Sequence, residues 1–216
     1  MKRKDTQSSL SENDGFYTSN NHKKIEKLVT CSVLISLVVI LQILSSNIRF
    51  GQFSITLALI PIIIGAILLG PSVGAILGFV MGIVVVIFDS ASFFVINPFY
   101  TIVICLTKST VAGFVTGLIY KVLSNKNTKV AIIVSALVCP IINTGLFAIG
   151  CVMFFYNTLV EWAGGTNALN FLFLSIIGIN FVVEFIVISI LSPTIVFLIK
   201  TLNEKKNNNW KNINLQ

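Results

Sequence analysis

Apolar residues dominate the chain from about residue 28 to about residue 200, and polar residues interrupt them only at intervals. A helix needs roughly 20 mainly apolar residues to cross a hydrocarbon core, and this chain supplies that length several times. The runs are continuously apolar, whereas the strands of a membrane barrel alternate apolar and polar residues. Because only helices and closed barrels satisfy every backbone polar group in lipid, the pattern predicts an all-α membrane protein.

The polar interruptions divide the apolar region into six predicted transmembrane helices. Polar residues end the first and third helices, a Gly-Pro turn follows the second, and Pro98 suits the start of the fourth. The predicted helices cover residues 28–46, 55–69, 73–88, 98–123, 130–155 and 171–200. We expect a disordered basic tail over 1–27, a six-helix membrane domain over 28–202 and a polar tail over 203–216.

The positions of lysine and arginine orient this bundle. Basic residues gather before the first helix, around the turn between the fourth and fifth, and after the sixth. With six helices these three groups share one side of the membrane, and Arg49 is the only basic residue of the opposite loops. Since basic loops face the cytoplasm, we predict a multi-pass protein of the cell membrane with both termini cytoplasmic. One helix more or fewer would scatter the charges over both sides.

Composition agrees with a membrane protein and narrows the choice of partners. The chain is 55% hydrophobic and 11% charged, whereas roughly 25% of a soluble domain is charged. A net charge of +7 would suggest nucleic-acid binding in a soluble protein, but these lysines lie at membrane edges, so no nucleic-acid partner is expected. The four cysteines lie in apolar runs without paired spacing, which indicates buried side chains rather than metal ligands or disulfides.

Small residues at four-residue spacing predict faces of close helix packing, because they let a neighbouring backbone approach. They are Gly70, Gly74, Gly78 and Gly82 in the third helix, Gly113 and Gly117 in the fourth, and Ser32 and Ser36 in the first. Packing within the chain is the first interpretation of each. Docking of a second protein on one of these faces is the alternative.

Four strongly polar residues lie inside the predicted helices, where an ionisable group usually faces a cavity or a partner. Lys108 is about ten residues into the fourth helix, roughly 15 Å deep at 1.5 Å per residue. Glu184 is about thirteen residues into the sixth helix, roughly 20 Å deep by the same rise. Asn143 lies near the middle of the fifth helix, and Asn180 is one turn from Glu184. We therefore expect these groups to share a depth.

Two compatible interpretations follow from this cluster. One is a structural ion pair between Lys108 and Glu184, with the amides completing its hydrogen bonds. The other is an outward-opening pocket for a small solute, in which the lysine would suit a carboxylate-bearing ligand. Asn97 and Arg49 lie at the outer rim and join the candidate binding residues.

No enzyme signature competes with a transport role. The sequence has no phosphate-binding loop of the G-x-x-x-x-G-K-[ST] type, no H-E-x-x-H and no G-x-S-x-G. We expect no catalytic residue, no metal site and no cofactor. Uphill movement of a solute would then depend on an ion gradient or on another polypeptide.

A motif in the second and third helices carries a family resemblance. Residues 55–78 read ITLALIPIIIGAILLGPSVGAILG, which is a Pro-containing helix, a Gly-Pro turn and a glycine-striped helix. This stretch resembles the corresponding helices in the substrate-binding S-components of energy-coupling factor (ECF) transporters. Size, six helices and cytoplasmic termini agree with that family, and the resemblance covers residues 28–202.

The resemblance implies a function and partners. S-components bind a vitamin or related micronutrient in an outward-facing pocket, dock on a shared membrane scaffold with two cytoplasmic ATPases, and topple to release their cargo. The family docks through an Ala-xxx-Ala pair on the first helix. Ser32 and Ser36 occupy the matching positions here, which are small but are not alanine.

Which vitamin is bound is a narrower question. The surroundings of Asn97 and Lys108, and the run CPIINTG at 139–145, are similar to the branch that includes pantothenate carriers. Pantothenate is a small carboxylate, so we place it first; riboflavin, folate, cobalamin and queuosine precursors stay open.

The alternatives from other classes are a self-sufficient secondary transporter or channel, and a scaffold or enzyme subunit with a purely structural polar core. Secondary transporters often have paired halves with broken helices, and the two halves of this chain show no such repeat.

Overall fold

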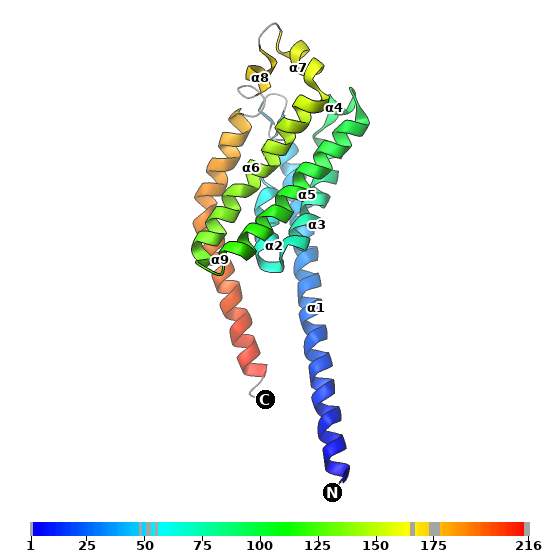
Figure 1. Ribbon diagram of the computed structural model, residues 1–216, viewed down its shortest axis with the longest axis vertical. Coiled ribbons are helices and arrows are strands. Elements are labelled where there is room, and N and C mark those ends of the chain that lie inside the picture. Colours follow the sequence, from blue (N-terminus) through cyan, green and yellow to red (C-terminus); the bar gives the residue numbers. More distant parts are fainter. Residues whose placement is uncertain are drawn as a thin grey trace.

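The computed structural model describes residues 2–47, 49–50, 53–54, 56–164, 167–172 and 178–213. Long helices stand side by side, and short elements lie at one end of the bundle (Figure 1). In chain order the elements are α1 (Lys2–Ser46), β1 (Arg49–Phe50), β2 (Phe53–Ser54), α2 (Leu59–Leu69), α3 (Pro71–Phe88), α4 (Ala91–Phe94), α5 (Pro98–Leu123), α6 (Thr128–Phe154), α7 (Tyr156–Trp162), α8 (Ala168–Phe171) and α9 (Ile179–Ile213). We call the end that carries β1, β2, α4, α7 and α8 the hairpin end.

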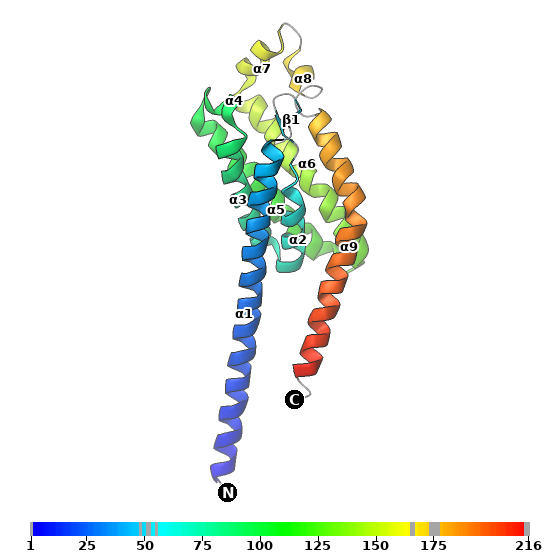
Figure 2. The same cartoon turned by 180° about the vertical axis from the view of Figure 1, so that it is seen from behind.

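The helices bear out the prediction of an all-α membrane protein. Four segments are long and apolar enough to cross a membrane: Lys24–Ser46, Pro71–Phe88, Pro98–Leu123 and Thr128–Phe154. Two shorter apolar helices, Leu59–Leu69 and Phe181–Phe197, bring the apolar segments among the described residues to six. Helix α1 begins and α9 ends on the side of the bundle opposite the hairpin end (Figures 1 and 2).

The first and last helices extend into the predicted polar tails. Helix α1 continues through residues 2–27, where we expected disorder, and α9 continues beyond residue 200 to Ile213. Both extensions project past the rest of the bundle (Figure 2). Adding residues to an existing helix is far easier than nucleating a new one, so an apolar helix can extend into a polar flank.

The predicted glycine stripe packs α3 directly against α5. A Cβ at Gly78 would meet the backbone carbonyl of Ser109, and one at Gly82 would lie 2.9 Å from the carbonyl oxygen of Cys105. Gly74 of α3 and Gly113 of α5 face each other's carbonyls in the same way. Gly74, Gly78 and Gly82 therefore serve packing within the chain, as the first interpretation predicted, whereas nothing lies within 4 Å of a Cβ at Gly70.

Helix α2 lies at the centre of the main hydrophobic core. Its residues Leu59, Ile62 and Ile63 are fully buried and pack with side chains from α3, α6 and α9. Gly70 adopts a φ of 99° and Pro71 begins α3, so the predicted Gly-Pro turn is confirmed. Glycine takes such positive φ values without strain, and proline suits the first turn of a helix.

Three of the four cysteines are buried, as predicted. Cys105, Cys139 and Cys151 are buried free thiols, and Cys31 is a partly buried one. The short antiparallel hairpin between β1 and β2 was not predicted; it pairs Arg49 with Ser54 and Phe50 with Phe53.

Candidate functional site

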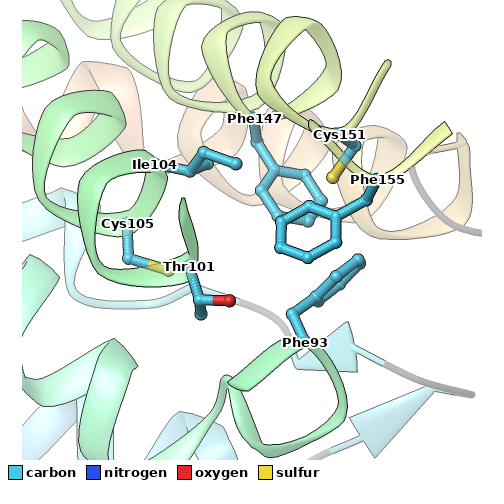
Figure 3. Close-up of a pocket in the computed structure, with 7 residues that line it drawn as sticks. All are labelled: Phe93, Thr101, Ile104, Cys105, Phe147, Cys151 and Phe155. Carbon is cyan, nitrogen blue, oxygen red and sulfur yellow. The ribbon is translucent and has the colours of Figure 1, made fainter. Parts of the chain in front are cut away.

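A small cavity lies between α5 and α6 at the hairpin end of the bundle (Figure 3). Phe93 of α4 forms one wall of the cavity. One face of α5 forms another, and one face of α6 together with Phe155, the residue directly after α6, forms the third. The lining residues are Phe93, Thr101, Ile104, Cys105, Phe147, Cys151 and Phe155. The void holds about 10 Å³, which is room for about one water molecule. This end of the bundle therefore contains a cavity that is far too small for a vitamin as it stands.

Phe93 packs against three aromatic rings beside this void. Its ring centre lies 5.0 Å from that of Phe155, 5.3 Å from that of Trp162 and 5.9 Å from that of Phe147. The rings of Phe155 and Phe147 meet it at 62° and 86°, in the edge-to-face geometry that aromatic pairs favour. Only 5% of Phe93 is exposed, so this ring closes the cavity from the α4 side.

Lys108 lies just beyond the cavity toward the middle of α5. It follows Ile104 by one helical turn, and residues three or four apart share a helix face. Its amine nitrogen Nζ lies 4.6 Å from the centre of the Phe147 ring, within the range of a cation–π interaction. Lys108 thus places its amine against an aromatic ring of the cavity wall, without being one of the lining residues itself.

Asn143 lies deeper, on the same face of α6 as Phe147. Three facing pairs set the register between the helices: Ile104 with Gly150, Lys108 with Phe147, and Thr116 with Cys139. This antiparallel register places Asn143 beside Ala112, one turn below Lys108. Asn143 is 3% exposed, and its Oδ1 is buried without a hydrogen-bond partner in the part of the chain that the structure describes. Buried amide oxygens are normally hydrogen-bonded, so Asn143 has an open acceptor in the bundle.

Glu184 uses its carboxylate to hold the chain that leads into α2. Its Oε1 accepts a hydrogen bond from the backbone N–H of Thr56 at 2.9 Å, and only 5% of the residue is exposed. The next N–H along the chain, that of Leu57, donates to Ser45 Oγ at 3.1 Å. Among the described residues, Lys108 contacts the Phe147 ring and Glu184 accepts the hydrogen bond of Thr56, and the two side chains form no ion pair with each other.

Glu184 is the sixth residue of α9, which begins at Ile179. Its depth in the predicted sixth helix stays a prediction. Residues 173–177, which the predicted sixth helix included, lie outside the described residues. The side chain of Asn180 lies outside them as well, so its proposed place beside Glu184 stays a prediction.

The two predicted rim residues, Asn97 and Arg49, lie at the start of a helix and in a short strand. Asn97 caps α5: its Oδ1 accepts the N–H of Tyr100 at 3.2 Å, which satisfies one of the free donors of a helix start. Arg49 belongs to β1 and pairs with Ser54, while its side chain lies outside the described residues. Their binding roles stay predictions.

A buried contact between α1 and α3 was missed by the sequence analysis. Gln42 is fully buried, and its Nε2 donates to Asp89 Oδ2 at 3.4 Å. The Oε1 atom of Gln42 is buried without a partner among the described residues. The side-chain amide of Gln42 within the predicted first helix was the sequence feature that could have indicated this buried contact. Phe93 was missed as well, because one phenylalanine in a short connection carries no pattern.

Comparison with known proteins identifies the family. Residues 26–196 match the family described as ECF transporter, substrate-specific component. The chain belongs to this family. ThiT from Listeria monocytogenes is a structural relative with a TM-score of 0.56 and 19% identity, over 81% of this chain and 98% of that one. At this identity the likeness supports the fold alone. No curated protein sequence matches the chain.

Members of the ECF family work with a membrane scaffold and ATPases, so the exposed face of α1 is of interest as a surface for a partner. Ser32 and Ser36 are exposed, and their hydroxyls donate to the carbonyls of Leu28 and Ser32 at 3.0 and 3.1 Å. Large apolar side chains surround them on the open side of the helix: Val29, Val33, Leu37, Ile40 and Leu44. This face of α1 carries small and apolar groups and has room for a neighbour.

Proposed function

We propose that this chain captures a small carboxylate-bearing vitamin outside the cell, pantothenate ranked first, and delivers it to an ECF module. The observation that carries the ligand class is the pair of groups below the cavity. Lys108 places a cation against Phe147, and Asn143 has a buried oxygen that no described residue pairs with. A carboxylate beside an amine forms a charge-assisted hydrogen bond, and a ligand N–H or O–H would satisfy the amide oxygen.

The same proposal assigns the orientation in the membrane. The six apolar segments cross it, both termini are cytoplasmic, and the hairpin end with its cavity faces outward. Support comes from the basic groups that flank the termini and the α5–α6 turn, since basic loops remain in the cytoplasm. The common location of the two termini in Figure 1 agrees with this arrangement.

Binding requires a rearrangement at the hairpin end. The cavity of about 10 Å³ is far below the roughly 300–1,000 Å³ of ordinary ligand pockets. The proposal therefore requires the side chains around this cavity to move apart when a ligand binds. Arg49, Asn97, Asn180 and Glu184 complete our set of proposed binding residues around Lys108 and Asn143.

Thermal-shift screening of the purified protein against a panel of B vitamins tests the ligand class. We expect pantothenate to raise the melting temperature, because a ligand that binds only the folded state stabilises it. Stabilisation only by vitamins that lack a carboxylate would contradict the proposal.

Co-purification tests the partners: we expect a membrane scaffold and two ATPases. Uptake into liposomes by the isolated chain would favour the self-sufficient transporter instead.

Docking through α1 is tested separately from binding. Ser32→Leu or Ser36→Leu should abolish uptake in cells while leaving binding by the isolated chain intact, because leucine blocks close approach of a partner helix. Ser189→Leu is a matched control, since Ser189 is an exposed serine of α9 whose hydroxyl also donates to a carbonyl one turn back. Normal uptake by both α1 variants would exclude this face from docking.

A further inference from the structure

We propose that Phe93 is a displaceable plug in the ligand site. In this proposal, which rests on the proposed function, the ligand places a compact apolar group where the Phe93 ring lies and an acidic group beside Lys108. Phe93 would then set both the access to the site and the size of ligand that it accepts.

The position of Phe93 distinguishes it from the other cavity residues. The remaining lining side chains belong to α5, to α6 or to Phe155 directly after α6, all parts of the main bundle. Phe93 comes instead from α4, a helix of four residues, and its ring points into the gap between the long helices (Figure 3). Removing this one ring would enlarge the cavity without moving a long helix.

The rest of the α4 segment is weakly buried. Phe94 is 39% exposed and Val95 is 86% exposed. The backbone hydrogen bonds recorded for Phe93 and Phe94 are local: both N–H groups donate to Ser90, and Phe93 accepts from Ile96 and Asn97. A segment with few buried contacts opens at low free-energy cost. The burial of Phe93 is therefore a contact that this segment gives up when it moves.

The geometry also limits the ligand. The centre of the Phe93 ring is 5.9 Å from that of Phe147, and Lys108 Nζ is 4.6 Å from the same centre. The plug and the cation are thus no farther apart than the sum of these distances. A short molecule with one apolar group and one acidic group can occupy both positions. Pantothenate fits this description, whereas cobalamin is far larger than the space that one phenyl ring vacates.

Thiol labelling tests the plug without any vitamin. Cys105 and Cys151 line the cavity, and Cys139 is fully buried elsewhere in α6. The probes are two methanethiosulfonate reagents of similar size, one with a sulfonate group and one with a trimethylammonium group. Modification at each cysteine is followed by peptide mass spectrometry. We expect Phe93→Ala to speed labelling of Cys105 and Cys151 by the anionic reagent about tenfold or more, because the accessible state becomes populated.

Three comparisons make this result specific. Phe94→Ala, a matched change on the same helix, should leave the rates near those of the wild type. Cys139 should stay unreactive in Phe93→Ala, which separates an open cavity from a loosened bundle. In the Phe93→Ala background, Lys108→Met should remove a preference of about tenfold for the anionic reagent, as expected when one charge concentrates anions in a cleft.

The outcomes separate this inference from the proposed function. Unchanged rates in both Phe93→Ala and Phe93→Leu would overturn the plug, and so would equal acceleration at Cys139 or no preference between the two reagents. These results do not depend on which vitamin is carried. If labelling behaves as expected but no vitamin binds and no ECF partner co-purifies, the plug stands and the proposed function fails.

Discussion

Helix α5 takes part in two interfaces of opposite character. Toward α3 it meets glycines, and Gly78 has no room even for a methyl group. Toward α6 it borders a small void, an aromatic cluster and a lysine, with the open oxygen of Asn143 one turn below. In lipid, close backbone packing of this kind stabilises helix pairs, whereas buried polar atoms without partners are costly. The contrast indicates a fixed seam on one side of α5 and an adaptable site on the other.

The largest expected effect is on the fixed seam. Gly78→Ala would push its Cβ into the Ser109 carbonyl, and backbone cannot yield as a flexible side chain does. We expect destabilisation of about 3 kcal/mol, at the upper end for overpacking, measured as a lower melting temperature in detergent. Gly145→Ala is the matched control on α6, because nothing lies within 4 Å of a Cβ at that position. Similar melting temperatures for the two variants would contradict the close packing of α3 against α5 at Gly78.

An intermediate effect is expected at the hydrogen bond between α9 and the chain entering α2. Glu184→Ala leaves the Thr56 N–H without its acceptor, and a buried unsatisfied donor costs about 1–3 kcal/mol. Hydrogen exchange at Thr56 should accelerate accordingly. Glu184→Gln keeps an acceptor oxygen and should protect Thr56 better than alanine does. Equal protection in the wild type and Glu184→Ala would show that this bond does not hold the connection.

The smallest effect on stability is expected at Asn143, and its sign is informative. The oxygen of Asn143 has no partner among the described residues, so Asn143→Leu removes an unsatisfied buried group and should leave the melting temperature unchanged or raised. The same change should weaken vitamin binding about tenfold, the loss of about one hydrogen bond. A large loss of stability with unchanged affinity would make Asn143 a structural residue.

Local patterns explain why much of the fold could be predicted. The six apolar segments, the glycine stripe and the Gly70–Pro71 turn each depend on a few neighbouring residues. Lys108 and Asn143 could be placed because α5 and α6 begin and end close to the predicted positions. Counting residues along a helix then gives their depth.

The remaining features depend on how distant segments meet. The partner of Glu184 is a backbone N–H of Thr56, beyond a hairpin that carries no clear signal in the sequence. The role of Phe93 follows from the way a four-residue helix aims one ring between α5 and α6. Apolar composition alone also cannot tell that α1 extends into a polar flank. These are properties of packing rather than of periodicity.

The most direct test of the account is a titration of the purified wild type and of Lys108→Met with pantothenate and other vitamins that carry a carboxylate. We predict that one of them binds the wild type and binds Lys108→Met about 10–100-fold more weakly, since a hydrogen bond to a charged group contributes about 1.5–3 kcal/mol. The melting temperature of the ligand-free variant should stay near that of the wild type. Equal affinity in both proteins would contradict a carboxylate site at Lys108.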